Sequence, residues 1–154
     1  CEDLDPEFTK SAQPGDVIVA GKNWGCGSSR EQAATCLKER GIRAIVAKSF
    51  ARIHYRNCLN EGLATIVRPD ACDELNMGDE AEVDFERGVI ISNGKEYPFP
   101  PYPEFVQGLI NDGGLIPHVQ KELGLAQKRR TQPPPRERLP QVKRTRDRTV
   151  QTTE

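Results

Sequence analysis

Residues 25–30 combine two glycines, two serines and an arginine in one short segment, Gly-Cys-Gly-Ser-Ser-Arg. Glycine lets a backbone approach a ligand closely, and the first amides of a following helix have no acceptor inside that helix. Arg30 adds a planar guanidinium that can hold a carboxylate through two hydrogen bonds. Ser28 and Ser29 add hydroxyls that can donate, accept or, once deprotonated, act as a base. This segment, called the serine loop below, therefore predicts an anion site suited to a small polycarboxylate.

A simpler alternative is that the two serines only stabilise the start of a helix. Ser28 or Ser29 would then cap the helix through its hydroxyl, and Glu31 or Gln32 would complete a capping box. The local sequence leaves both the anion site and the helix cap open.

Two other chemistries need residues that the serine loop lacks. A Walker-type phosphate loop needs Gly-Lys-Ser or Gly-Lys-Thr after four intervening residues, and a dinucleotide loop needs a third glycine where Arg30 stands. A hydrolase-type nucleophile needs a Gly-x-Ser-x-Gly turn and a positioned histidine, and the chain has two histidines, His54 and His118. We therefore expect neither a phosphate loop nor a serine hydrolase.

Three short apolar runs predict buried strands around the serine loop, over residues 15–20, 42–47 and 64–67. The helices predicted between them have inward-facing positions at Ala33, Ala34 and Leu37 and at Phe50, Ile53 and Asn57, and they end near Gly41 and Gly62. Strands and helices that alternate in this way are typical of an α/β unit with at least a partly parallel sheet.

The pattern changes in the second half of the chain. Ala81, Val83 and Phe85 alternate with charged residues, and the next apolar run ends at Asn93-Gly94, a pair typical of a hairpin turn. Two more helices are predicted, with apolar positions at Phe105, Val106, Leu109 and Ile110 and at Ile116, Val119 and Leu123. The first half therefore predicts crossovers between parallel strands, and the second half predicts a hairpin and two helices.

Charge is distributed unevenly along the 154 residues. Residues 128–154 carry nine basic and three acidic side chains, whereas residues 1–127 carry thirteen basic and twenty acidic ones. The basic segment contains several prolines and no aromatic residue, so it cannot bury enough apolar surface to offset the entropy of ordering. We therefore expect one folded domain over residues 1–127 and a disordered basic tail over residues 128–154.

Hydropathy and cysteine usage bear on the compartment. The sequence has no run of the roughly 20 apolar residues that a membrane span needs, and no charged-then-apolar signal segment opens it. Its five cysteines are odd in number and form no Cys-x-x-Cys pair, so they predict neither a disulfide framework nor a zinc site. This pattern indicates reduced thiols and a cytoplasmic location.

Two motifs together resemble a known family. Residues 25–33 read Gly-Cys-Gly-Ser-Ser-Arg-Glu-Gln-Ala, and residues 48–53 read Lys-Ser-Phe-Ala-Arg-Ile, with Asn57 and Gly62-Leu63 after them. In this order they resemble the swivelling domain of the aconitase superfamily, and most of all the separate small subunits of 3-isopropylmalate dehydratase and homoaconitase. The resemblance covers roughly residues 3–125. It implies an α/β fold of the swivelling β/β/α type, layered with a partly parallel mixed sheet.

The resemblance also implies an activity, that of a hydro-lyase which isomerises a hydroxy acid by removing water and adding it back. Ser28 would be the catalytic base, and Gly27, Ser29 and Arg30 would bind the substrate, a small hydroxy di- or tricarboxylic acid. A large partner subunit would carry a [4Fe-4S] cluster, and this chain would bind no metal, which agrees with its lack of cluster-type cysteine spacing. We expect no membrane partner and no nucleic acid.

Some features stay open within the family. A first strand and a loop that selects the substrate are expected upstream of Glu2, so the sequence leaves open which alkylmalate is converted. In the second motif, Phe50 and Ile53 are expected in the core, and Arg52 and His54 on the helix surface. The alternatives to 3-isopropylmalate dehydratase are homoaconitase, another alkylmalate dehydratase, or a non-catalytic module of the same fold that binds RNA or protein.

Deleting residues 128–154 distinguishes an enzyme subunit from a non-catalytic module. A dehydratase subunit should keep its turnover number within about twofold after the deletion, because the basic tail lies outside the catalytic motifs. The measurement is turnover of the full and shortened chains, each supplied with the large subunit. Unchanged binding to RNA or protein would contradict a role for the tail, whereas loss of such binding would favour the non-catalytic module.

Overall fold

Three short parallel strands form the centre of the computed structural model, which describes residues 6–27, 30–125 and 142–144. They are β1 (Val17–Ala20), β2 (Ala44–Ala47) and β3 (Ala64–Val67), and their order in the sheet is β3-β2-β1. α2 (Gln32–Glu39) connects β1 to β2, and α3 (Arg52–Asn60) connects β2 to β3. The predicted α/β unit with parallel strands is confirmed.

The central strands are buried on both faces, as is typical of parallel strands covered by two layers. Ile18 and Ile45, which are paired in register, pack against the layer formed by α1 (Phe8–Ser11), α2 and α3. Val17 and Val46 point to the opposite face and belong to a second core cluster. β1 and β2 therefore each contribute to two cores, which explains why their sequences are apolar without interruption.

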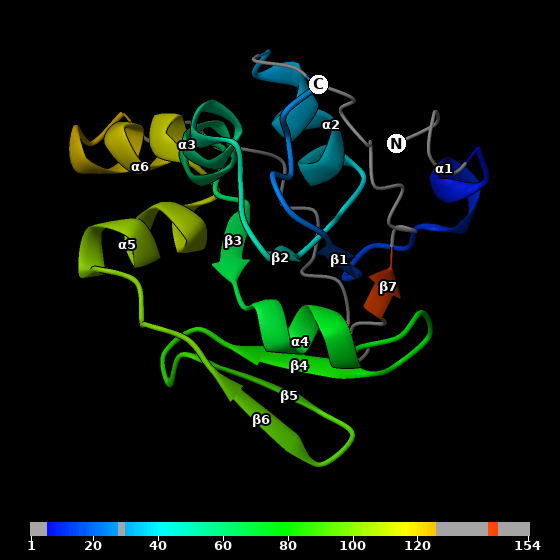
Figure 1. The fold of residues 1–154 in the computed structure, drawn as a ribbon. Coiled ribbons are helices and arrows are strands. Elements are labelled where there is room, and N and C mark those ends of the chain that lie inside the picture. The colour runs from blue at the N-terminus through cyan, green and yellow to red at the C-terminus, as the bar shows by residue number, and fades with distance from the viewer. Residues whose placement is uncertain (1–5, 28–29, 126–141, 145–154) are drawn as a thin grey trace.

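The second core lies between the parallel sheet and an antiparallel one. This sheet contains β4 (Ala81–Asp84), β5 (Val89–Ser92) and β6 (Lys95–Pro98) in sequence order, and α4 (Pro69–Glu74) lies beside it. Figure 1 shows the resulting layers, with α2 and α3 above the parallel sheet and β4, β5 and β6 below it. The predicted β/β/α layering is confirmed, although the parallel and antiparallel strands form two sheets and not one mixed sheet.

The hairpin turn and the C-terminal helices also follow the predicted pattern. Asn93 and Gly94, between β5 and β6, have φ angles of 51° and 76°, which the Asn-Gly pair adopts readily. α5 (Glu104–Asp112) and α6 (Leu115–Glu122) come next and pack against each other. None of the described helices is long and apolar enough to cross a membrane.

The structure corrects the prediction for the face of α3. Ile53, which we expected in the core, is 54% exposed, whereas His54, which we expected on the surface, is 3% exposed. The inward positions of this helix are His54 and Cys58, one residue later than the predicted ones. The reason is the entry into α3, where the Ala51 N–H donates to the carbonyl of Trp24 at 2.8 Å and so sets the rotation of the first turn.

The basic tail is described at one point. Val142–Arg144 forms a short strand, β7, which pairs in parallel with β1 on the side opposite β2. These three residues therefore differ from the disordered segment predicted there. The prediction for the rest of residues 128–154 falls outside the described residues, as does the serine pair at positions 28 and 29.

The different burial of two isoleucines makes a prediction about stability. Ile45→Ala should lower the free energy of unfolding by about 2–5 kcal/mol, because Ile45 is fully buried in the central strand. Ile53→Ala, the matched control, should change it by no more than about 0.5 kcal/mol. Urea unfolding of both variants measures the two values. Equal losses would contradict the rotation of α3 described above.

Candidate active site at the carboxyl ends of the parallel strands

The two sequence motifs meet at one edge of the parallel sheet. The serine loop follows β1 and the second motif follows β2, and the carboxyl ends of parallel strands share an edge. Three hydrogen bonds join the segments: the Asn23 N–H donates to Ser49 Oγ at 2.7 Å, the Trp24 N–H donates to the Ser49 carbonyl at 2.9 Å, and the Ala51 N–H donates to the Trp24 carbonyl. The second motif therefore anchors the start of the first.

The backbone of the loop is tightly turned between these anchors and α2. Asn23 and Gly25 have positive φ angles of 55° and 86°, and the Cys26 N–H donates to the Asn23 carbonyl at 3.2 Å. A Cβ atom added at Gly25 would lie 2.3–2.4 Å from the Cβ, Cγ and Cδ2 atoms of His54. No side chain fits there, so the first glycine of the motif is required by its contact with α3.

A buried histidine lies directly under the loop. His54 Nε2 lies 3.4 Å from Cys58 Sγ, one helical turn later. Burial lowers the pKa of His54, and burial together with the nearby Glu61 carboxylate raises the pKa of the Cys58 thiol to about 12. The pair is therefore neutral near pH 7. It is not the thiolate and imidazolium pair of a cysteine hydrolase.

Two polar atoms under the loop have no hydrogen-bond partner in the described part of the chain. They are the indole nitrogen Nε1 of Trp24 and the ring nitrogen Nδ1 of His54, and both are buried. An unpaired buried group of this kind costs about 1–3 kcal/mol. Among the described residues, these two nitrogen atoms therefore form no hydrogen bond that would help to hold the loop.

The start of α2 shows which residue caps this helix and so tests whether Ser28 or Ser29 is a helix cap. The first helical residue is Gln32 and the cap residue is Glu31, which makes no side-chain capping hydrogen bond. The Ala33 N–H donates to the Arg30 carbonyl at 3.2 Å, so Arg30 lies just before the first turn. The capping position is therefore not one of the two serines. The positive end of an eight-residue helix lies beside the loop instead.

The predicted site residues are placed as follows. Gly27 and Arg30 are both exposed, on either side of the serine pair. Ser28 and Ser29 lie outside the described residues. Sequence reasoning missed the roles of Ser49 and His54, although His54 and Cys58 have the i, i+4 spacing that puts two residues on one face of a helix.

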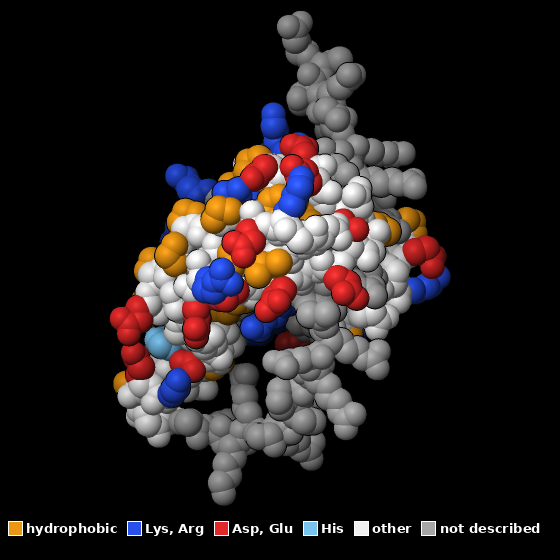
Figure 2. Space-filling model, turned by 90° about the horizontal axis from the view of Figure 1, so that it is seen from below, with side chains coloured by type: hydrophobic (Ala, Val, Ile, Leu, Met, Phe, Trp, Pro, Cys, Tyr) orange, Lys and Arg blue, Asp and Glu red, His pale blue; other side chains and the backbone are white. Residues whose placement is uncertain are grey.

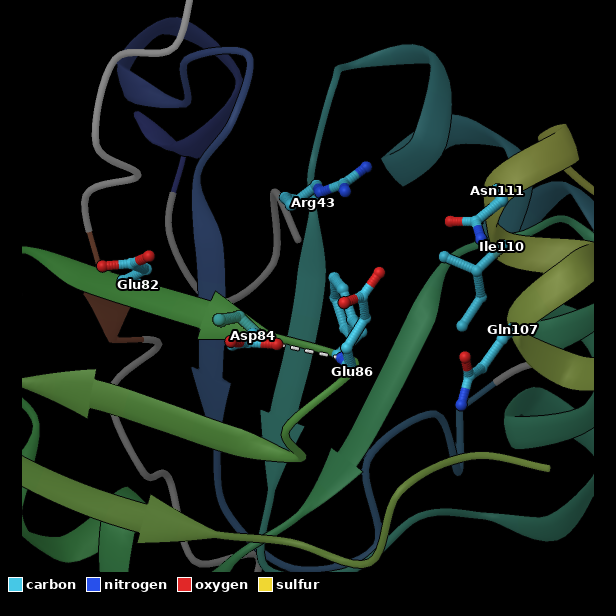
Figure 3. A pocket seen from close by; sticks show the side chains of 9 residues that line it. Arg43, Glu82, Asp84, Glu86, Gln107, Ile110 and Asn111 are labelled. Carbon is cyan, nitrogen blue, oxygen red and sulfur yellow. Dashed lines mark hydrogen bonds between the residues drawn. The ribbon is translucent and has the colours of Figure 1, made fainter. Parts of the chain in front are cut away.

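A cavity of about 330 Å³ lies at the other edge of the parallel sheet. Its lining includes Arg43, which precedes β2, Asp84 at the end of β4, and Glu86 and Asn111 from the β4–β5 turn and α5 (Figure 3). The Asp84 carboxylate accepts hydrogen bonds from the backbone amides of Glu86 and Arg87. This cavity is rich in carboxylates, so it does not suit the anionic ligand that the serine loop predicts.

Charged and metal-binding side chains were sought in the part of the chain that the structure describes. On the face that Figure 2 shows, Lys and Arg side chains are interspersed with Asp and Glu side chains. No group of three or more His, Cys, Asp or Glu in the described part could hold a metal ion. Cys58 and Cys72 are buried thiols whose pKa values are raised to about 12 and about 11, so neither is prepared for metal binding.

The lowered pKa of His54 predicts a dependence of stability on pH. The unfolded chain takes up a proton on this residue near its ordinary pKa of 6.5, at higher pH than the folded protein does. His54 therefore supports stability fully above pH 6.5, and this support is lost as the pH falls below that value. We expect His54→Phe to reduce the fall in unfolding free energy between about pH 7.5 and about pH 5.5. Urea unfolding of the wild type and of His54→Phe at both pH values measures this difference in unfolding free energy. The same difference in both proteins would refute the prediction.

Comparisons with known proteins agree with this geometry. Residues 4–71, which include both motifs, match the family model described as the aconitase C-terminal domain. The 3-isopropylmalate dehydratase small subunit of Caldicellulosiruptor bescii is 50% identical over 124 residues, which cover 79% of this chain and 75% of the relative. Small subunit 1 of the same enzyme in Thermotoga maritima is 49% identical over 122 residues, or 78% of this chain and 73% of the relative.

A solved structure supports the same assignment. The crystal structure of 3-isopropylmalate dehydratase from Methanocaldococcus jannaschii superposes with a TM-score of 0.72 at 40% identity, over 79% of this chain and 73% of that one. None of these comparisons supports the homoaconitase or the RNA-binding alternative. The chain belongs to the family of 3-isopropylmalate dehydratase small subunits, whose fold is that of the aconitase C-terminal domain.

Proposed function

We propose that this chain supplies the serine loop to the active site of a 3-isopropylmalate dehydratase, in which it acts with a large subunit. One observation carries the proposal. The loop is held over the carboxyl ends of β1 and β2 by the Ser49, Trp24 and Ala51 hydrogen bonds, and it leads into the positive end of α2. Such an edge, with a helix N-terminus beside the loop, suits an anionic substrate.

Arg30 and the neighbouring backbone would bind a carboxylate of the substrate. Arg30 is exposed and lies one residue before the cap of α2, so its guanidinium charge and the helix dipole act at the same end of α2. Gly27 carries no side chain, and space around the position of its Cβ is open, so a ligand can approach the backbone there. Ser29 would add a hydrogen bond to Arg30 or to the substrate.

Ser28 would be the base. Its oxygen would take the proton from the carbon next to the one that bears the hydroxyl, and the electron pair of that C–H bond would form the double bond. The hydroxyl would leave as water with a second proton, donated by an acidic group of the large subunit. Addition of water in the other orientation, with return of the proton, gives the isomer. Arg30, the first amides of α2 and closure of the site against water would stabilise the serine alkoxide.

We assign the [4Fe-4S] cluster, and with it activation of the departing hydroxyl, to the large subunit. The described cysteines of this chain do not fit a cluster, because Cys58 and Cys72 are separate buried thiols and Cys26 and Cys36 are the exposed ones. The substrate would be a small hydroxy dicarboxylic acid. The free thiols fit the reducing conditions of the cytoplasm, where we place the enzyme.

Ser28→Ala tests the catalytic base. With the large subunit present, the variant should lower kcat by about 100-fold or more, because the proton-transfer group is lost, while assembly of the two subunits is retained. Ser29→Ala is the matched control, with a smaller loss expected. The measurement combines turnover with gel filtration of the mixed subunits. Turnover near the wild-type value in Ser28→Ala would end the proposal.

Arg30→Lys tests the carboxylate grip. A lysine keeps the positive charge but cannot form the two parallel hydrogen bonds of a guanidinium, so KM should rise more than kcat falls. Steady-state kinetics over a range of substrate concentrations separates the two effects. An unchanged KM would show that Arg30 does not hold the substrate.

A further inference from the structure

We propose that His54 is a positioning residue, which fixes the backbone of the serine loop at Gly25 from below without touching the substrate. The proposal rests on the proposed function, because the loop that His54 supports is the one assigned to catalysis. It concerns a residue outside the predicted site, in the helix after the second motif. Its evidence is the contact between His54 and Gly25.

The contact is tight enough to determine the backbone path. The space that a side chain at Gly25 would need is filled by His54, whose Cγ lies 2.3 Å and whose Cδ2 lies 2.4 Å from the position of a Cβ atom. Gly25 is therefore pressed against an aromatic ring at a positive φ of 86°. The exposed part of the loop begins with the next residue, Cys26, and continues through Gly27 toward the serines in the sequence.

His54 is itself held firmly. It is 3% exposed, and its Nε2 lies 3.4 Å from Cys58 Sγ. Three residues earlier, the N-cap residue of α3, Ala51, donates its N–H to the Trp24 carbonyl. The loop and the ring are thus fixed to the same short connection between β2 and α3. A displacement of the ring would move Gly25, and misplacement of a reacting group by about 1 Å can cost about 100-fold in rate.

The role of the ring is steric and not one of acid–base chemistry. His54 is shielded from solvent, and burial favours its neutral form. Its Nδ1 atom has no hydrogen-bond partner in the described part of the chain, so this nitrogen forms no hydrogen bond with the described residues of the loop. An aromatic ring without nitrogens should therefore support Gly25 almost as well.

The first experiment compares His54→Ala with His54→Phe in the assembled enzyme. Loss of the ring should lower kcat by about 10- to 100-fold and change KM by less than about threefold, because positioning of the base is affected more than binding. His54→Phe should recover most of the loss. Ile90→Ala, a fully buried deletion in the antiparallel sheet, is the control for general destabilisation. Equal losses in the Ala and Phe variants would overturn the steric role.

A double-mutant cycle tests the contact itself. Gly25→Ala should be strongly impaired, because its methyl group would overlap the imidazole of His54. His54→Gly removes the Cβ, Cγ and Cδ2 atoms that this methyl group would meet, so in that background the double variant should lose less kcat than the product of the two single losses. Strictly multiplicative losses would show that the two residues act independently and would refute the proposal.

A readout without turnover separates this proposal from the proposed function. Trp24 is the single tryptophan of the chain and precedes Gly25, so its fluorescence reports on the loop in the isolated protein. His54→Ala should shift the emission to longer wavelength and increase quenching by acrylamide, whereas His54→Phe and Ile90→Ala should resemble the wild type. Wild-type emission in His54→Ala would overturn the positioning role. Absence of turnover in the wild-type assembly would instead refute the proposed function and leave the fluorescence test valid.

Discussion

The parallel pairing of β1 with β2 is the constraint on which the rest of the structure depends. Their residues are matched from Val17↔Ala44 to Ala20↔Ala47, so the two strands end level with each other. The segments that follow them therefore leave the sheet side by side. That coincidence allows Ser49 to bind the backbone of Asn23 and Trp24, although the residues are 25 or more positions apart in sequence. The two sequence motifs lie together in one candidate site for this reason.

A rigid platform under the loop follows from how the sheet is buried. Parallel strands of four residues offer few hydrogen bonds, and their stability comes from apolar contacts on both faces. Small residues such as Ala44, Ala47 and Ala64 let the flanking layers approach closely. The helices and the antiparallel sheet therefore hold the strand ends in place, and the turned loop can keep positive φ angles at Asn23 and Gly25.

The two edges of the parallel sheet differ in their electrostatics. Helices α2 and α3 begin at the carboxyl edge, so their positive ends and Arg30 lie there. The amino edge has the cavity lined by Glu82, Asp84 and Glu86. An anionic substrate is favoured at the first edge and disfavoured at the second. Residues 1–127 carry more acidic than basic side chains, yet the edge of the sheet beside the serine loop has positive groups.

The sequence by itself determined the class of fold, the order of the elements and the identity of the loop. Uninterrupted apolar runs, glycine stops and the Asn93-Gly94 pair act locally, so they can be read without knowing what packs against them. The serine loop was identifiable because its residue types and spacing are unusual. Local sequence could not choose between an anion site and a helix cap, since both use the same hydroxyls near the same amides.

The tertiary structure decided which residues support the loop and where the helix faces point. The exposed Ile53 and the buried His54 have their places exchanged relative to the prediction, because a backbone hydrogen bond from Ala51 to Trp24 sets the rotation of α3. That bond joins two segments distant in sequence, so no local pattern contains it. The need for glycine at position 25 likewise arises from a ring 29 residues later, which only the packing of α3 against the loop brings into contact.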